Sequence, residues 1–196
     1  MAGSKGRGII IQDRDRHLLR ELATMRVIDR EQAKCVAGFG STTRANCRLL
    51  GLKRAGLVRR FFLGTIRGTS KALYALSTKG AALVDVPMRG PRRGQNEMLA
   101  ADFFVAHQLK VNDLYCLLKY RAIPIPDAKL LRWMGFFAPF QGTSLIPDGY
   151  FEIAVPTKTI AAFLEIDLGH ERGPAWRRKV QEYVQYAVSG DRKSVV

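Results

Sequence analysis

The feature that most constrains the fold is a change of hydrophobic period at Gly56. Before it, Ala45, Leu49 and Leu52 recur at i, i+4 and i+7, which is the spacing of one buried helical face. After it, residues 57–76 read as two short strands joined by a glycine-rich loop. A helix that leads directly into a hairpin predicts mixed α and β structure for the N-terminal half of the chain.

Further helices are expected on both sides of this junction. The expected helices are residues 13–25, 29–37, 41–55 and 77–84. The third begins at Ser41-Thr42-Thr43, a run of residues that favour helix N-caps. Three helices followed by a hairpin is the order of a winged helix-turn-helix, and the stretch RLLGLKRAGLVRRFFL…KALYALSTKG resembles winged-helix regulators. We therefore predict a flexible basic N-terminus at residues 1–11 and a DNA-binding domain at residues 12–86.

The charge of the chain is concentrated in the same half. The whole sequence has 32 Lys and Arg against 17 Asp and Glu, a formal net charge of +15. Residues 1–100 hold 20 basic and 7 acidic residues, a net charge of +13, whereas residues 101–196 have a net charge of +2. A strongly basic half is typical of a protein that meets a polyanion, and double-stranded DNA is the expected partner. The alternative is that the charge only makes a well-solvated surface.

Other features exclude several classes of protein. No run of 18 apolar residues is present, so neither a membrane span nor a membrane partner is predicted. The only early apolar run, residues 9–11, is too short for the core of a signal peptide. Cys35, Cys47 and Cys116 are too far apart for a disulfide framework or a zinc knuckle. We expect a cytoplasmic protein.

In a winged helix-turn-helix the third helix lies in the major groove. With Ala45, Leu49 and Leu52 turned inward, its outward face would carry Thr43, Arg44, Cys47 and Arg48. Arginine reads guanine with two hydrogen bonds, and basic residues of the hairpin suit phosphate or minor-groove contacts. The predicted DNA-binding residues are Thr43, Arg44, Arg48, Arg59, Arg60, Arg67 and Lys71.

A stretch rich in Pro, Gly and Arg, residues 87–95, interrupts both periods and predicts a linker. A second domain is expected at residues 96–196. It would begin with a helix at residues 96–118, either continuous or broken near 111–113, followed by strands at 145–155 and 159–167 and a helix from Pro174 to about Val188.

Acidic residues gather where these strands end. Glu165 and Asp167 would share one face of a strand, and Asp148 would join them if the two strands pair. Carboxylates so crowded need a cation, and oxygen ligands suit Mg²⁺ or Mn²⁺. Lys179 lies on one helical face with Trp176, Tyr183 and Tyr186 and could reach the carboxylates. The predicted catalytic residues are Asp148, Glu165, Asp167 and Lys179, with the three acids as metal ligands.

This pattern resembles a variant of the PD-(D/E)xK nuclease core. Asp167 stands where that core usually has its lysine, Lys179 is a candidate substitute, and the chain has little room for a last strand after the final helix. Together with the winged helix, the segments LIPDGYFEI, LEIDLGHE and RRKVQEYVQY resemble the replication-relaxation family of bacterial plasmids and mobile elements, over residues 12–190. The resemblance implies DNA binding in replication, mobilisation or their regulation.

The expected fold class is therefore α+β, with an N-terminal winged helix-turn-helix followed by an α/β PD-(D/E)xK-like domain that can lack its last strand. Whether the protein is an enzyme stays open. One alternative is a Mg²⁺-dependent DNA endonuclease or nickase targeted by its winged helix. Another is a transcriptional repressor whose C-terminal domain dimerises. A homodimer and plasmid replication or mobilisation proteins are further partners that the sequence leaves open.

Overall fold

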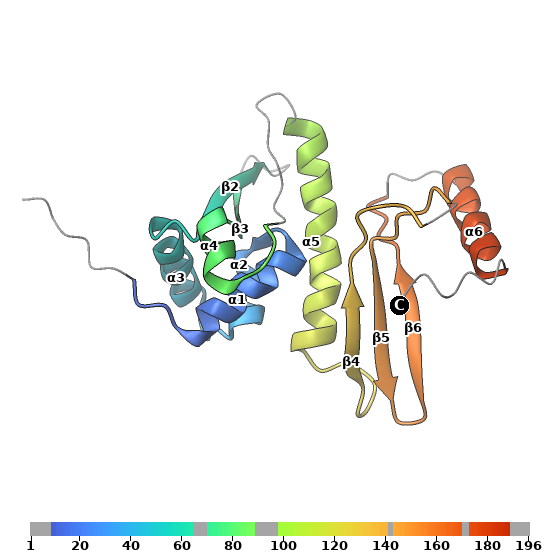
Figure 1. Ribbon diagram of the computed structural model, residues 1–196, viewed down its shortest axis with the longest axis horizontal. Helices are drawn as coiled ribbons and strands as arrows, with labels where there is room; N and C mark the ends of the chain where they lie inside the picture. Colours follow the sequence, from blue (N-terminus) through green and yellow to red (C-terminus); the bar gives the residue numbers. More distant parts are fainter. Residues whose placement is uncertain (1–8, 65–69, 89–97, 141–142, 170–172, 189–196) are drawn as a thin grey trace, which may run out of the picture. The chain divides into compact units, whose positions relative to one another are not determined.

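The computed structural model in Figure 1 describes residues 9–64, 70–88, 98–140, 143–169 and 173–188, with the backbone alone at 98–102. The chain divides into two compact units, residues 1–120 and residues 121–196. Each unit is described by itself.

The first unit contains the helices and the hairpin that the sequence predicts. In chain order they are α1 (Asp13–Met25), α2 (Arg30–Ala37), α3 (Thr42–Arg54), β2 (Val58–Gly64), β3 (Ser70–Leu76) and α4 (Thr78–Val84). Three helices begin at side chains that accept a hydrogen bond from the first turn, those of Asp29, Ser41 and Ser77. The predicted starts of these three helices are confirmed, because the capping residues that begin them can be recognised in the sequence.

One strand of the first unit was not expected. The two-residue strand β1 (Ile28–Asp29) pairs antiparallel with β3, so that Ile28 lies opposite Tyr74. The sheet order is β1-β3-β2, which makes β2 an edge strand. Two residues are too few to show the alternation by which strands are recognised.

The core of this unit lies between α1, α3 and β3. The side chains there that are completely buried include Leu18, Leu19 and Leu22 of α1, Ala45, Leu49 and Leu52 of α3, and Leu73 and Leu76 of β3. The apolar face predicted for the third helix is therefore confirmed.

The long helix α5 (Met98–Tyr120) is continuous and packs with the first unit. The buried amide of Asn112 donates to the carbonyl oxygens of Met25, at 3.0 Å, and Val27, at 2.6 Å. In the other direction, the buried amide of Gln32 donates to the carbonyl oxygen of Leu109 at 2.8 Å. Through these bonds the buried side chains of Asn112 and Gln32 find hydrogen-bond partners where α5 packs on the first unit.

Apolar contacts complete the attachment of α5. Val105 and Leu109 form a buried cluster with Val27 and Leu73, against which Phe61 and Leu63 of β2 also pack. The sequence predicts that the helix after the linker begins the second domain, whereas α5 belongs to the first compact unit. The composition of the linker indicates a break between two elements. It does not show whether the next helix buries its apolar face against the domain before the break or the one after it.

The second unit is a three-stranded antiparallel sheet with one helix. It contains β4 (Lys129–Met134), β5 (Gly149–Val155), β6 (Lys158–Leu164) and α6 (Gly173–Val188), with strand order β4-β5-β6. The hairpin at Pro156 and the final helix were predicted, and β4 was not. The predicted strands were too long, since β5 begins at Gly149 and β6 ends at Leu164.

Aromatic side chains hold α6 on this sheet. The rings of Phe140 and Tyr186 stack with centroids 4.7 Å apart, and those of Phe163 and Tyr183 lie 5.6 Å apart. The molecule is thus an α+β protein with two small antiparallel sheets, which confirms the coarse fold class. The last strand that a PD-(D/E)xK core would have falls on residues 189–196, outside the described residues.

A buried carboxylate links α1 to α5. Glu21 accepts hydrogen bonds from the Tyr115 hydroxyl, at 2.7 Å, and from Lys119 Nζ, at 2.8 Å. Burial acts to raise the pKa of Glu21, but the hydrogen bonds from Lys119 and Tyr115 outweigh it and hold the pKa below its usual value.

We expect Glu21 to stabilise the fold above pH of about 4.3, the ordinary glutamate pKa, and to lose this effect as the pH falls through the lower pKa of the folded state. Urea unfolding of the wild type and Glu21→Gln at several pH values should show a stability difference that shrinks on acidification. The exposed Asp127→Asn serves as the control for carboxylate removal. A Glu21→Gln difference that is constant with pH would contradict this role.

Candidate nucleic-acid interface and acidic cluster

The start of α3 presents polar and basic side chains to solvent. Ser41 Oγ accepts a hydrogen bond from the backbone N–H of Arg44 at 3.2 Å, so the helix begins at once after the turn. Thr43 and Arg44 lie in its first turn and are exposed. Among the described residues, the Arg44 guanidinium has no hydrogen-bond or ion-pair partner. It is therefore available to a ligand.

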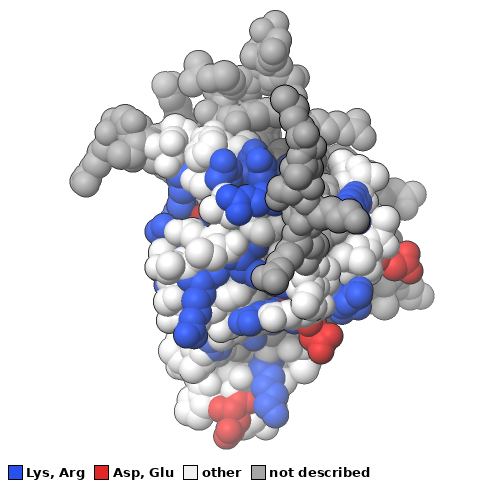
Figure 2. Space-filling view, turned by 90° about the vertical axis from the view of Figure 1, so that its left-hand side faces the viewer, with Lys and Arg blue, Asp and Glu red and all other residues white. Residues whose placement is uncertain are grey.

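Basic side chains prevail on the face of the first unit that carries α3, as Figure 2 shows. Besides Thr43 and Arg44, the exposed residues of the helix are Cys47, Lys53 and Arg54. The sequence analysis missed Lys53 and Arg54. The spacing of Arg54, seven residues after Cys47, was the signal that could have placed it on the outward face.

Arg48 does not lie on that outward face. Its Nε donates to Asp15 Oδ1 at 2.7 Å, and its Nη2 donates both to Asp15 Oδ2 and, at 2.6 Å, to the carbonyl oxygen of Ile10. The Asp15 carboxylate is completely buried, and its hydrogen bond raises the pKa of Arg48. Position 48 follows the buried Ala45 by three residues and precedes the buried Leu52 by four, which puts it at the edge of the inward face.

We expect Arg48→Ala to destabilise the protein by about 3–5 kcal/mol, because it leaves a buried carboxylate without its partner. Arg44→Ala, in the same helix but exposed, is the matched control and should change stability by about 0.5 kcal/mol or less. Chemical denaturation of both variants measures the difference. Equal stabilities would show that Asp15 does not depend on Arg48.

The basic residues predicted for the hairpin have several different environments. Arg59 Nε donates to the carbonyl oxygen of Leu76 at 3.5 Å. The Arg60 guanidinium lies over the ring of Phe62, with its carbon 5.2 Å from the ring centroid.

The remaining two hairpin residues are Lys71 and Arg67. Lys71 forms an ion pair with Asp29, the residue that caps α2. Arg67 lies outside the described residues. Arg59 and Arg60 are the exposed cations that the structure describes on β2.

In the second unit, the pairing of β5 with β6 brings Asp148, just before β5, next to the residues that follow β6. The backbone N–H of Asp148 donates to the carbonyl oxygen of Leu164 at 3.0 Å, which extends the ladder by one bond beyond β5. Asp148 Oδ2 in turn accepts a hydrogen bond from the backbone N–H of Ile166 at 2.7 Å. Asp148 thus fixes the path of the chain where it leaves the sheet.

Glu165 and Asp167 lie beyond the end of β6. The prediction that they share one face of a strand is therefore wrong. Glu165 accepts hydrogen bonds from Lys179 Nζ, at 2.9 Å, and from the Tyr183 hydroxyl. Asp167 accepts from the Trp176 indole at 3.2 Å and from a backbone N–H in its own loop. Lys179 was predicted to reach the carboxylates, and it contacts that of Glu165.

This environment affects Tyr183 as well. Burial, followed by the hydrogen bond to Glu165, raises the pKa of the Tyr183 phenol well above its usual value. A phenol so held stays protonated and donates its hydrogen bond, so it is a poor candidate for a nucleophile.

In this arrangement the three carboxylates are engaged by hydrogen-bond donors of the protein itself. Both oxygens of Glu165 already accept hydrogen bonds, and Asp148 and Asp167 are engaged with backbone N–H groups. Within the described part of the chain, no three His, Cys, Asp or Glu side chains are grouped so that they could hold a metal ion. The Lys179 ammonium gives Glu165 a counter-charge within the protein.

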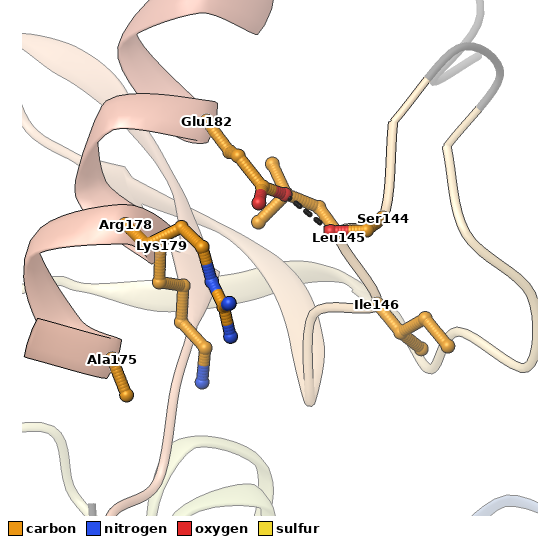
Figure 3. A pocket seen from close by; sticks show the side chains of 7 residues that line it. All are labelled: Ser144, Leu145, Ile146, Ala175, Arg178, Lys179 and Glu182. Carbon is orange, nitrogen blue, oxygen red and sulfur yellow. Dashed lines mark hydrogen bonds between the residues drawn. The ribbon is translucent and has the colours of Figure 1, made fainter. Parts of the chain in front are cut away.

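A shallow pocket lies beside this cluster, between α6 and residues 144–146 (Figure 3). Arg178 and Lys179 line it on the helix side, and Glu182 accepts a hydrogen bond from the Ser144 hydroxyl at 2.7 Å. Its volume of about 270 Å³ is below the usual range of roughly 300–1,000 Å³ for small-molecule sites.

We expect millimolar Mg²⁺ or Mn²⁺ to leave the melting temperature of the wild type unchanged, since a ligand stabilises a fold only if it binds there. Lys179→Ala should lower the melting temperature, because Glu165 loses its counter-charge, and added metal should then restore part of the loss. The exposed Lys158→Ala in the same unit is the control. A wild-type rise that Glu165→Gln abolishes, together with nicking of supercoiled plasmid, would contradict the metal-free arrangement.

The fold and these two sites define an α+β protein with a basic unit of helices and a hairpin and a small sheet unit that contains an acidic cluster. The chain belongs to the replication-relaxation family, which matches residues 19–195. This confirms the resemblance seen in the sequence, and membership suggests a role in the replication of plasmids or mobile elements. No curated protein and no solved structure gives a significant match. None of the helices in the described ranges is long and apolar enough to cross a membrane.

Proposed function

We propose that the protein binds double-stranded DNA through its first unit, acting as a winged helix-turn-helix whose α3 enters the major groove. The observation that carries this proposal is the exposed, basic outward face of α3, where Arg44 has no partner among the described residues. The net charge of +13 over residues 1–100 supports it, because phosphate neutralisation supplies much of the affinity for DNA.

The residues of this face have different roles in the proposed complex. Thr43 and Arg44, in the first turn of α3, contact base edges, and Arg44 is the residue best placed to read guanine. Arg54, Arg59 and Arg60 contact phosphates, which positions the protein without reading sequence. Lys71 and Arg48 stabilise the fold through their ion pairs, and Arg67 remains a predicted contact of the wing.

The second unit acts in this proposal as a nuclease-like platform without cleavage activity. Its support is the ion pair between Lys179 and Glu165, which takes the place of a metal ion. The cleavage alternative would require this pair to open. Binding of a second copy, or of replication or mobilisation proteins, is a predicted property of this unit.

The biological setting follows from the family. DNA binding by this chain would serve the replication or mobilisation of a plasmid or mobile element, or the regulation of these processes. A repressor would use the same interface on α3 and would differ in where its binding site lies relative to a promoter.

Duplexes selected from a random pool by the wild-type protein provide the ligand for a direct test. We expect Arg44→Ala to weaken binding to a selected duplex by roughly 1–3 kcal/mol and to affect a random duplex much less. Arg54→Ala should weaken both equally and reduce the slope of log K against log salt by about 0.9. Lys110→Ala, an exposed cation on α5, is the control. Equal losses on both duplexes for Arg44→Ala would overturn its role in base reading, and no selectable duplex would overturn the proposed function.

A further inference from the structure

The edge strand β2 has two faces with different surroundings. Because strand residues alternate, Arg59, Phe61 and Leu63 share one face, and Arg60 and Phe62 share the other. Phe61 and Leu63 pack against the cluster that includes Val105 and Leu109 of α5. The face with Arg60 and Phe62 is therefore the one turned away from α5.

That face presents an aromatic ring and a cation to solvent. Phe62 is 47% exposed, although phenylalanine usually buries most of its surface. The Arg60 guanidinium, also exposed, lies over the Phe62 ring at 5.2 Å. The two groups place an aromatic ring and a cation side by side on an edge strand of the half of the chain that holds most of the net positive charge.

Such a surface has a specific chemical complement. A nucleic-acid base stacks on an aromatic ring or a guanidinium plane, and each base stacked on an aromatic residue contributes substantially to the affinity for single strands. In a duplex the faces of the bases are covered by their neighbours, so a base can stack on Phe62 only where it is unpaired.

We propose that Arg60 and Phe62 bind an unpaired nucleotide of single-stranded DNA, with the base stacked on Phe62 and the phosphate next to Arg60. This rests on the proposed function and extends it: the same unit that binds duplex DNA through α3 also holds a strand that has been separated from its complement. Single strands are what the opening of a replication origin exposes.

The test compares a labelled single-stranded oligonucleotide with the duplex of the same sequence, by fluorescence anisotropy on the full chain. We expect Phe62→Ala to weaken binding of the single strand by about tenfold or more and binding of the duplex by less than about twofold. Phe104→Ala, which removes a phenylalanine that is 71% exposed on α5, is the matched control and should leave both affinities unchanged.

A second variant gives a direct readout of stacking. Phe62→Trp should retain single-strand affinity, and its added tryptophan fluorescence should be quenched when the single strand binds. The wild type, whose two tryptophans, Trp133 and Trp176, lie in the other unit, provides the baseline.

Three outcomes would overturn the proposal. They are an unchanged single-strand affinity in Phe62→Ala, an equal loss on single strand and duplex, which indicates a minor-groove wedge, and the absence of quenching in Phe62→Trp. If the wild type selects a duplex but Phe62→Ala has no effect on the single strand, this proposal alone fails. If the wild type binds no duplex, the proposed function fails whatever the single-strand result.

Discussion

The completely buried carboxylate of Asp15 decides how α3 can present its cations. A charge without access to water needs a partner of opposite sign and hydrogen-bond donors, and Arg48 provides both. Arg48 is thereby bound to α1 and to the chain just before it, at Ile10. Its neighbour Arg44, one helical turn earlier, is exposed and has no such carboxylate partner among the described residues. Two arginines four residues apart in one helix thus have different environments, because one buried acid lies beside only one of them.

The same rule explains the acidic cluster of the second unit. Asp148, Glu165 and Asp167 gather where β5 begins and β6 ends, and each is already satisfied by a donor from the chain itself. Their partners come from α6 and from the backbone, so the cluster fastens the helix to the sheet. The residue types that suggest metal chemistry in the sequence also form a set of internal hydrogen bonds in the structure.

The sequence predicted what depends on local patterns and missed what depends on distant partners. Helix starts at Asp29, Ser41 and Ser77 were predictable, because a cap and the helix it starts are neighbours in the chain. The approach of Lys179 to Glu165 was predictable from one helical face and one strand end. The ion pair of Arg48 with a residue 33 positions earlier has no local signal, and neither does the bond from Gln32 to Leu109 of α5, which spans 77 positions. The two-residue strand β1 was too short for any periodicity.

The attachment of α5 to the first unit has a consequence for anyone who wishes to transplant the N-terminal half into another protein. The composition of residues 87–95 suggests a domain boundary there. A fragment that ended at that point would nevertheless expose the apolar surface of Val27, Leu73, Phe61 and Leu63. It would also remove the buried hydrogen bonds that the Asn112 amide donates to the carbonyl oxygens of Met25 and Val27. The smallest fragment that keeps these contacts therefore extends to Tyr120, and its C-terminal boundary lies just after α5.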